Sequence, residues 1–274
     1  AATCVIALCA GQYSVSVPEV IKILASRFVN VTKTWSNTAE GVVFTLRLPR
    51  MIGAVLVGSA LSLSGAAYQG VFKNPLVAPD LLGVSSGACV GASVAILLHL
   101  NSFGVQAMAF VAGILAVGLT LFIPRLIKNT NMTMLVLSGI IVKGIMDSVM
   151  GIIKYVADPE TELQSITYWQ LGSLTKVLPR DLFTVGPVII AASVIIFLLR
   201  WRINILSLGD REAKTLGVSV TVVRNFIIIC ATLLTASAVC ISGTIGWIGL
   251  VIPHFARMLT GPDNTKAIPA SILI

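Results

Sequence analysis

Residues 81–124 read LLGVSSGACVGASVAILLHLNSFGVQAMAFVAGILAVGLTLFIP and contain no charged side chain. A transmembrane helix needs about 20 predominantly apolar residues, so this stretch is long enough for two crossings. We expect the two crossings to be joined near Asn101–Gly104, where polar residues and a glycine interrupt the apolar run. The stretch therefore predicts a polytopic bundle of transmembrane helices.

The composition of the whole chain agrees with a membrane protein. Hydrophobic residues make up 56% and charged residues 11%, whereas a soluble domain has about 25% charged residues. A net charge of +8 would suggest nucleic acid as a partner, but the mean hydropathy of +0.96 argues against it, because basic residues in membrane proteins mostly mark loops. The cysteines lie in apolar runs without metal-ligand spacing. We expect neither a nucleic-acid partner nor a metal site.

Other uncharged or nearly uncharged stretches predict the remaining crossings. We place them at residues 51–72, 132–155 and 182–199, with a re-entering pair in 225–256 that is broken at Ser242–Gly243–Thr244. With the two crossings of residues 81–124, this gives seven fairly complete spans. The chain begins in what we interpret as the end of a first helix and stops inside another. We therefore expect residues 1–274 to form one all-α transmembrane domain.

The stretch RWRINILSLGDREAKTLGVSV, residues 200–220, is a long polar interruption on one side of this bundle. It carries charges of both signs between Gly209 and Gly217, a pattern typical of a short solvated helix with a breaker at each end. An ordinary connecting loop is the alternative interpretation. If this stretch is cytoplasmic, basic residues are slightly more numerous on that side, in the sense of the positive-inside rule.

Small residues recur at helical spacing in two predicted spans. Gly83, Gly87 and Gly91 follow one another every four residues, and residues 58–67 are rich in Gly, Ser and Ala. Small residues at this spacing let helix backbones approach closely in lipid, where there is no hydrophobic drive between helices. The pattern predicts tight helix packing.

Four segments resemble signatures of one family, in the right order. They are LRLPRMIGAVLVGSALSLSGAAYQGVFKNPLVAPDLLGVSSGACVG (residues 46–91), YWQLGSL (168–174), LGDREAKTLGV (208–218) and GTIGWIGLVIPHFARMLTGPD (243–263). They are similar to the iron-chelate and vitamin B12 permeases of type II ATP-binding-cassette importers. The resemblance extends over nearly the whole chain, and four ordered matches make it specific.

The resemblance implies a permease subunit of about ten helices, of which this chain would lack part of the first and most of the last two. It implies a homodimer in the bacterial cytoplasmic (inner) membrane, with the substrate path at the dimer axis. It also implies two cytoplasmic ATPase subunits, which hold ATP and Mg, and a periplasmic or lipid-anchored binding protein that delivers the cargo. The expected cargo is an iron(III) chelate of the siderophore type, and haem, cobalamin-like compounds and oxyanions are cargoes of similar proteins.

The same resemblance assigns roles at the two ends of the bundle. Residues 200–220 would form the loop that couples to the ATPase. Its candidate coupling residues are Leu208, Gly209, Asp210, Arg211, Glu212, Lys214 and Gly217. Arg47 and Arg50, at the predicted outer mouth of the 51–72 span, could pair with carboxylates on the binding protein, because a guanidinium suits bidentate contacts. The alternative is that they only anchor the helix at headgroup level.

The predicted span at residues 132–155 carries the least expected charge, Lys143. A lysine inside a span is costly unless it is paired or faces water, so it is a functional candidate. Asp147 follows one helical turn later, so the alternative interpretation is an ion pair between the two residues that neutralises both. By resemblance this helix lines the substrate path, and Asn131, Met132 and Thr133 at its start match the inner gate.

No enzyme motif is present. The chain has no glycine-rich phosphate-binding loop that ends in Lys-Ser or Lys-Thr, so we expect a partner to hydrolyse ATP. The alternative hypothesis is an ion-coupled secondary transporter that uses Lys143 and Asp147. Inverted repeats would favour that hypothesis, and none is visible. A purely structural membrane anchor is disfavoured by the intramembrane charges and the glycine-rich packing.

Overall fold

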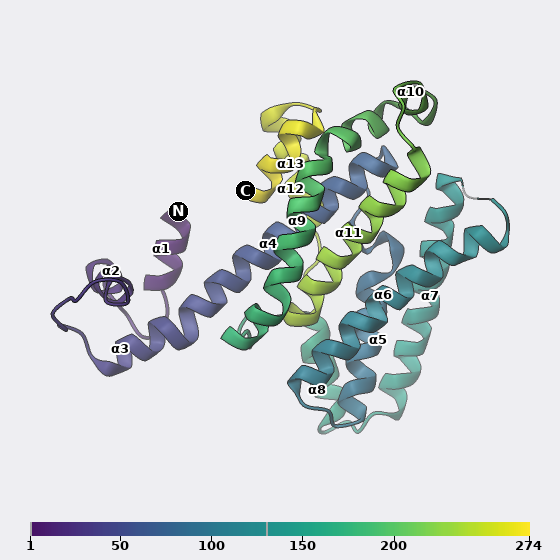
Figure 1. Ribbon diagram of the computed structural model, residues 1–274. Helices are drawn as coiled ribbons and strands as arrows, with labels where there is room; N and C mark the ends of the chain where they lie inside the picture. Colours follow the sequence, from purple (N-terminus) through teal and green to yellow (C-terminus); the bar gives the residue numbers. More distant parts are fainter. Residues whose placement is uncertain (1, 130) are drawn as a thin grey trace.

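The computed structural model describes residues 2–129 and 131–274, and every regular element among them is helical (Figure 1). The elements in chain order are α1 (Ala2–Cys9), α2 (Val17–Ala25), α3 (Asn37–Gly41), the π-helical η1 (Val42–Arg47), α4 (Leu48–Phe72), the 3-10 helix η2 (Pro79–Leu82), α5 (Val84–Leu97), α6 (Ser102–Leu126), α7 (Met132–Val156), α8 (Glu162–Leu171), α9 (Pro179–Leu208), α10 (Asp210–Thr215), α11 (Val220–Ser242), α12 (Ile248–Thr260) and α13 (Asn264–Leu273). The prediction of an all-α bundle is confirmed.

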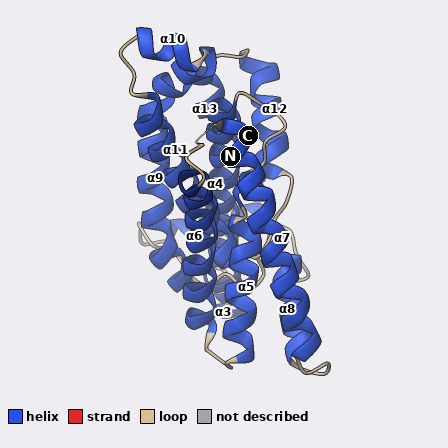
Figure 2. Cartoon of the chain, turned by 90° about the vertical axis from the view of Figure 1, so that its right-hand side faces the viewer, coloured by secondary structure: helices blue, strands red, loops and turns tan. Residues whose placement is uncertain are grey.

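The long helices run between two ends of the molecule. In both views α10 lies at one end, whereas α3 and α8 lie at the other (Figures 1 and 2). Among the described residues, five helices are long and apolar enough to cross a membrane. They are Asn37–Phe72 (α3, η1 and α4 together), Ser102–Leu126, Met132–Val156, Pro179–Leu208 and Val220–Ser242. The chain is therefore a multi-pass membrane protein.

The prediction of seven fairly complete spans was wrong for two of them. The helix α5 has 14 residues and α12 has 13, and at about 1.5 Å per residue neither reaches across the hydrocarbon core. The three residues before each helix, 81–83 and 245–247, carry no charge, but the last of them interrupts the helical backbone. Gly83 has φ +80° and Trp247 has φ +69°. Hydropathy does not detect such backbone breaks. The predicted break at Ser242 is confirmed as the end of α11.

The helix α4 forms the centre of the bundle. Every residue from Ala60 to Phe72 is buried, and α4 packs against α9, α11, α12 and α13. Its polar residues bond across to α11: the Tyr68 and Thr232 hydroxyls are 3.0 Å apart, and the Ser64 and Thr235 hydroxyls are 2.9 Å apart. Such interhelical hydrogen bonds satisfy buried hydroxyls where no water is available.

The predicted close packing of small residues is confirmed between α5 and α6. A Cβ atom on Gly87 would lie 2.5 Å from the Cβ of Ala116, and one on Gly91 would lie 2.6 Å from the Cβ of Ala112. Only a glycine leaves room for the facing helix at these two positions. Gly83 has a different role, because its left-handed backbone turns the chain into α5.

The helix α9 continues past the residue at which we placed its end. We predicted a crossing at residues 182–199 followed by a polar stretch, but α9 extends to Leu208. The guanidinium carbon of Arg200 lies 3.8 Å from the ring centroid of Phe197, and Ile203 and Leu206 are fully buried. The arginines therefore extend from the helix surface without ending the helix, and only Gly209 ends it.

Candidate functional site

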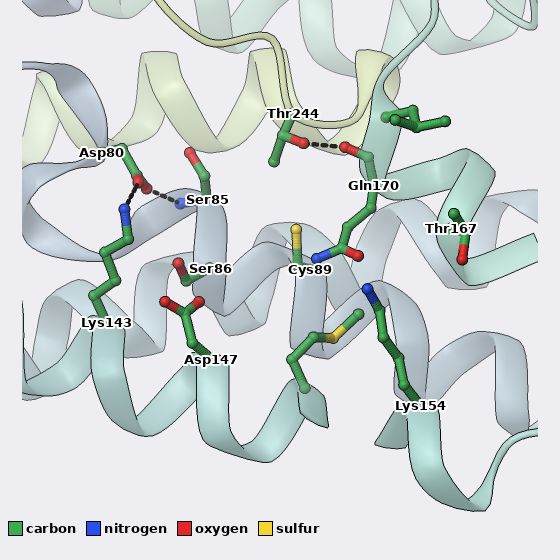
Figure 3. Close-up of a pocket in the computed structure, with 12 residues that line it drawn as sticks. Asp80, Ser85, Ser86, Cys89, Lys143, Asp147, Lys154, Thr167, Gln170 and Thr244 are labelled. Carbon is green, nitrogen blue, oxygen red and sulfur yellow. Dashed lines mark hydrogen bonds and ion pairs between the residues drawn. The ribbon is translucent and has the colours of Figure 1, made fainter. Parts of the chain in front are cut away.

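A cavity of about 470 Å³ opens beside α7 and is lined mainly by polar and charged side chains (Figure 3). Its lining residues are Asp80, Ser85, Ser86 and Cys89 from η2 and α5, Lys143, Asp147, Met150 and Lys154 from α7, Thr167, Gln170 and Leu171 from α8, and Thr244 from the α11–α12 link. The α7 residues are spaced by four, three and four, so they share one helical face. A polar stripe along α7 therefore faces the cavity.

The backbone around the cavity is held by hydrogen bonds between distant segments. The Thr244 hydroxyl donates to the carbonyl oxygen of Gln170, and the Ser173 amide donates to the carbonyl oxygen of Ser242 at 2.6 Å. Gly172 and Gly243 meet here, both with positive φ. These contacts fix α8 against the α11–α12 link and so position the Gln170 side chain at the cavity.

Lys143 is paired with an acidic residue, but not with Asp147. Its ammonium lies 2.7 Å from the carboxylate of Asp80, and no ion pair between Lys143 and Asp147 is present in the described part of the chain. The other oxygen of Asp80 accepts a hydrogen bond from the Ser85 amide. Figure 3 shows Lys143 extending toward Asp80 while Asp147 projects from the next turn of α7. The alternative interpretation, a self-neutralised Lys143–Asp147 pair, is therefore wrong, and a role of both residues in the substrate path stays a prediction.

Asp80 is the functional candidate that the sequence reasoning missed. A helical spacing rule finds partners within one turn, whereas Asp80 lies 63 positions before Lys143. The signal was present, because Asp80 is the only charged residue between Lys73 and Arg125. An isolated acid in so long an apolar region has the same cost as an isolated lysine, so it needs a partner.

The predicted gate residues lie at the opposite end of α7 from Lys154. Asn131 is the exposed N-cap of α7, and Thr133 is exposed. Met132 is half-buried and packs against the main hydrophobic core. None of the three lines the cavity, and their role as an inner gate stays a prediction.

The predicted coupling segment contains a separate short helix, α10, between its two glycines. Gly209 has φ +149° and Gly217 has φ +76°, both in the region that favours glycine. Ala213 of α10 is fully buried, whereas the side chains of Leu208, Arg211, Glu212 and Lys214 are exposed. The interpretation as a solvated helix with breakers at both ends is confirmed for residues 209–217.

Asp210 differs from its neighbours on α10 because it is bound within the chain. One carboxylate oxygen accepts hydrogen bonds from Arg224 at 2.7 Å and from Lys73 at 3.2 Å. The bond from Arg224, with a smaller contribution from Lys73, lowers the pKa of Asp210 below its ordinary value of 3.8. A depressed carboxyl pKa stabilises the fold above the ordinary value, and this contribution is lost as the pH falls through the folded-state pKa. The two bonds are therefore intact at neutral pH.

The two arginines at the other end have different surroundings. The guanidinium of Arg47 donates to the carbonyl oxygens of Leu8 at 2.7 Å, of Cys9 at 3.1 Å and of Tyr13. Arg50 is half-buried and makes no ion pair with any described residue. Arg47 thus holds the N-terminal segment, while the guanidinium of Arg50 has no acidic partner in this part of the chain.

The sequence and fold of the whole chain were compared with those of known proteins. A family model described as the FecCD transport family matches residues 1–274, the full length of the chain. The chain belongs to the FecCD transport family.

Curated relatives of this FecCD protein are permeases. The molybdate import system permease protein MolB of Haemophilus influenzae is 36% identical over 273 residues, which are 99% of this chain and 80% of MolB. A Helicobacter pylori permease named for an iron chelatin transport system is 40% identical over 233 residues, 85% of this chain and 70% of that protein.

A solved structure gives the same fold. It is an inward-facing ABC transporter assigned to the metal-chelate type, with 34% identity and a TM-score of 0.88 over 99% of this chain and 82% of that one. This FecCD protein is therefore a permease subunit of an ABC transporter. The family resemblance predicted from the four sequence motifs is confirmed.

Proposed function

We propose that this permease moves a ferric chelate of the siderophore type across the bacterial cytoplasmic membrane by alternating access. Two permease subunits would form the path at their dimer axis, and two cytoplasmic ATPase subunits, which hold ATP and Mg, would bind at α10. A periplasmic or lipid-anchored binding protein would deliver the cargo. In this scheme ATP binding and hydrolysis supply the difference in stability between outward-open and inward-open states.

The polar cavity on α7 is the observation that carries the proposal. Its volume of about 470 Å³ lies within the usual range of about 300–1,000 Å³ for small-molecule sites. The cavity presents ammonium groups on Lys143 and Lys154 and hydroxyls on Ser85 and Ser86, all of which can donate hydrogen bonds. Ferric chelates have many oxygen acceptors on their surface, so these donors suit such a cargo.

The lining also explains why binding in the path would be weak. Asp80 neutralises Lys143, and Asp147 offsets the charge of Lys154, so the cavity has no net charge. About half of the Lys143 side chain is exposed, and a solvated ammonium gains little from an additional anionic partner. A cargo that binds weakly can leave on the far side, which a transport path requires.

The names of two relatives point to different cargoes, and a small oxyanion such as molybdate is the second candidate. The Helicobacter pylori relative is named for an iron chelatin, whereas MolB is named for molybdate, a small oxyanion. A small oxyanion would fill only part of the cavity and would compete with Asp80 for Lys143. We therefore favour the larger chelate. Haem is of similar size, whereas cobalamin-like compounds are larger still.

An uptake assay with the complete transporter tests the cargo. We expect proteoliposomes with permease, ATPase subunits and binding protein to take up a radioactive ferric siderophore at least about tenfold faster than radioactive molybdate, a difference of about 1.4 kcal/mol. Vesicles loaded with a non-hydrolysable nucleotide serve as the control. Faster uptake of molybdate would contradict the cargo assignment.

We assign docking of the binding protein to Arg50 and a structural role to Arg47, and substitution of each residue tests this assignment. Arg50→Gln is expected to weaken binding-protein affinity about tenfold, or about 1.4 kcal/mol, with little change in thermal unfolding. Arg47→Gln is expected to destabilise the fold by about 1.5–3 kcal/mol, because the carbonyl oxygens of residues 8, 9 and 13 lose a charged donor. Surface plasmon resonance measures the affinity for the binding protein, and melting in detergent measures the stability of the fold, so the two measurements separate the two effects.

Lys22→Gln is the matched control for both arginine variants. Lys22 is an exposed cation on α2, at the same end of the chain, and its loss changes the net charge by the same amount. We expect neither affinity nor melting temperature to change. Unaltered affinity in Arg50→Gln would remove Arg50 from the docking site.

A further inference from the structure

The chain between α4 and α5, residues 73–83, lies between the coupling helix and the cavity. We name it the α4–α5 connector. It begins at Lys73, which caps α4 with a left-handed backbone (φ 53°), and it ends at Gly83. Between them lies η2, which carries Asp80. The connector therefore joins the end of the molecule that carries α10 to the side of α7 that lines the cavity.

One end of the connector is bound to α10. The ammonium of Lys73 lies 3.2 Å from the carboxylate of Asp210. The same carboxylate is 2.7 Å from Arg224, whose side chain is only 13% exposed. A nearly buried guanidinium cannot move far, so it fixes Asp210 at the base of α11. Asp210 thus joins α10, the connector and α11 at one point.

The other end of the connector is bound to α7. Asp80 pairs with Lys143 at 2.7 Å (Figure 3). The Leu81 carbonyl packs so closely on Gly139 of α7 that no side chain fits there, and the Thr120 hydroxyl of α6 donates to the Leu82 carbonyl at 3.0 Å. This end of the connector is therefore held by both α6 and α7.

The connector is stiff between its two ends. The Gln69 side chain, which is 3% exposed, donates to the Val77 carbonyl at 3.1 Å. The Leu76 amide donates to the Asn74 side chain at 2.9 Å. The Pro79 ring occupies the space beside Gly249 of α12. A segment with so many fixed groups transmits a displacement at one end to the other, whereas a slack loop would absorb it.

We infer that the Lys73–Asp210 and Asp80–Lys143 pairs are positioning contacts through which the α4–α5 connector transmits movement of α10 to α7 at the cavity. This inference rests on the proposed docking of ATPase subunits at α10. The four residues do not hydrolyse nucleotide. They set how far the cavity wall follows the coupling helix, and thus how much cargo moves for each ATP consumed.

Both pairs are well suited to transmit movement without adding much stability. Their side chains are between 33% and 49% exposed, and exposed ion pairs contribute little to folding stability because water competes for both partners. Removing one pair should therefore leave the permease folded and assembled. The loss should appear in coupling alone.

The experiment uses the complete transporter in proteoliposomes and measures cargo transported per ATP hydrolysed. We expect Asp80→Asn, Lys143→Gln and Lys73→Gln each to lower this ratio about threefold, in line with the loss of one exposed ion pair. Melting temperature and co-purified ATPase should stay unchanged. Because the two pairs act in series, Lys73→Gln with Lys143→Gln should lower the ratio no further than either change alone.

Two features of the design separate coupling from an effect on cargo binding. Asp80→Asn and Lys143→Gln change the cavity charge in opposite directions, so an effect on a charged cargo would have opposite signs, whereas a broken contact lowers the ratio in both. Lys33→Gln is the matched control. Lys33 and Glu40 form a pair of the same length, 2.7 Å, with side chains 49% and 33% exposed, but away from the connector.

The outcomes decide between the inference and the function on which it rests. Opposite signs for Asp80→Asn and Lys143→Gln, additive losses in the double variant, or an unchanged ratio in Lys73→Gln would overturn the inference while wild-type transport remains ATP-driven. If the wild-type permease transports cargo without its ATPase, the proposed function itself fails. A loss in Lys33→Gln equal to that in Lys143→Gln would also overturn the inference.

Discussion

Replacing Gly65 with alanine is expected to destabilise the permease by about 3 kcal/mol or more, at the upper end of the usual cost of overpacking. A Cβ atom on Gly65 would overlap the carbonyl of Gly249, where α4 crosses α12. Backbone atoms cannot rotate away as a side chain can, so the two helices would have to separate. At about 2–4 °C per kcal/mol for a chain of this size class, the melting temperature should fall by about 6–12 °C.

Gly58→Ala is the matched control on the same helix. Among the described residues, no atom outside the neighbouring backbone of α4 lies within 4 Å of the position that its Cβ would occupy. Alanine is favoured over glycine inside a helix by about 1 kcal/mol. We therefore expect the same chemical change to be neutral or stabilising at Gly58. Melting of the detergent-solubilised protein, followed by fluorescence-detected gel filtration, measures both. Equal melting temperatures for Gly65→Ala and Gly58→Ala would show that α4 and α12 do not approach as closely as described.

Reversing the two exposed basic charges of α10 is expected to separate the permease from its ATPase. Arg211→Glu with Lys214→Glu should lower the amount of ATPase that co-purifies, and the rate of ATP-dependent uptake, by at least about tenfold. Both side chains are exposed on α10, and buried Ala213 keeps the helix in place. The variant should therefore fold normally and lose only the contact with its partner.

Charge reversal at another site on the same side provides the control. Arg125 and Lys128 are exposed at the end of α6, and Arg125→Glu with Lys128→Glu makes the same change in net charge. We expect this variant to retain its ATPase. An equal loss in both variants would mean that α10 is not the principal contact.

The sequence predicted most of the long helices because their limits coincide with local signals. The helix α6 begins one residue after Asn101, whose side chain caps it, and α7 begins at Met132 as expected. Gly209 and Gly217 correctly bounded α10 because each adopts a backbone that other residues avoid. An element boundary can be predicted from the sequence when a cap residue or a glycine stands at the point where the backbone changes.

The errors concern features that depend on distant residues. Hydropathy could not separate the short helices α5 and α12 from full crossings, because the three residues before each helix, 81–83 and 245–247, carry no charge. Lys143 pairs with Asp80 across 63 positions, and helical spacing pointed to Asp147 instead. The bonds of Arg47 to residues 8, 9 and 13 were likewise invisible, since carbonyl acceptors have no sequence signature.

The ion-coupled alternative loses the observation that favoured it. That hypothesis required Lys143 and Asp147 to act together, and Lys143 is instead bound to Asp80 on the connector. Family membership places the chain among ABC transporter permeases. Asp147 remains a lining residue of the cavity, and its place in the substrate path is a prediction.

The source of energy is the central claim, and uptake by reconstituted vesicles tests it most directly. Permease vesicles are prepared with and without the ATPase subunits and binding protein, and each is given either ATP or an imposed proton or sodium gradient. We predict accumulation of the ferric chelate only when ATP and both partners are present. Accumulation driven by a gradient, without nucleotide or partners, would contradict the account.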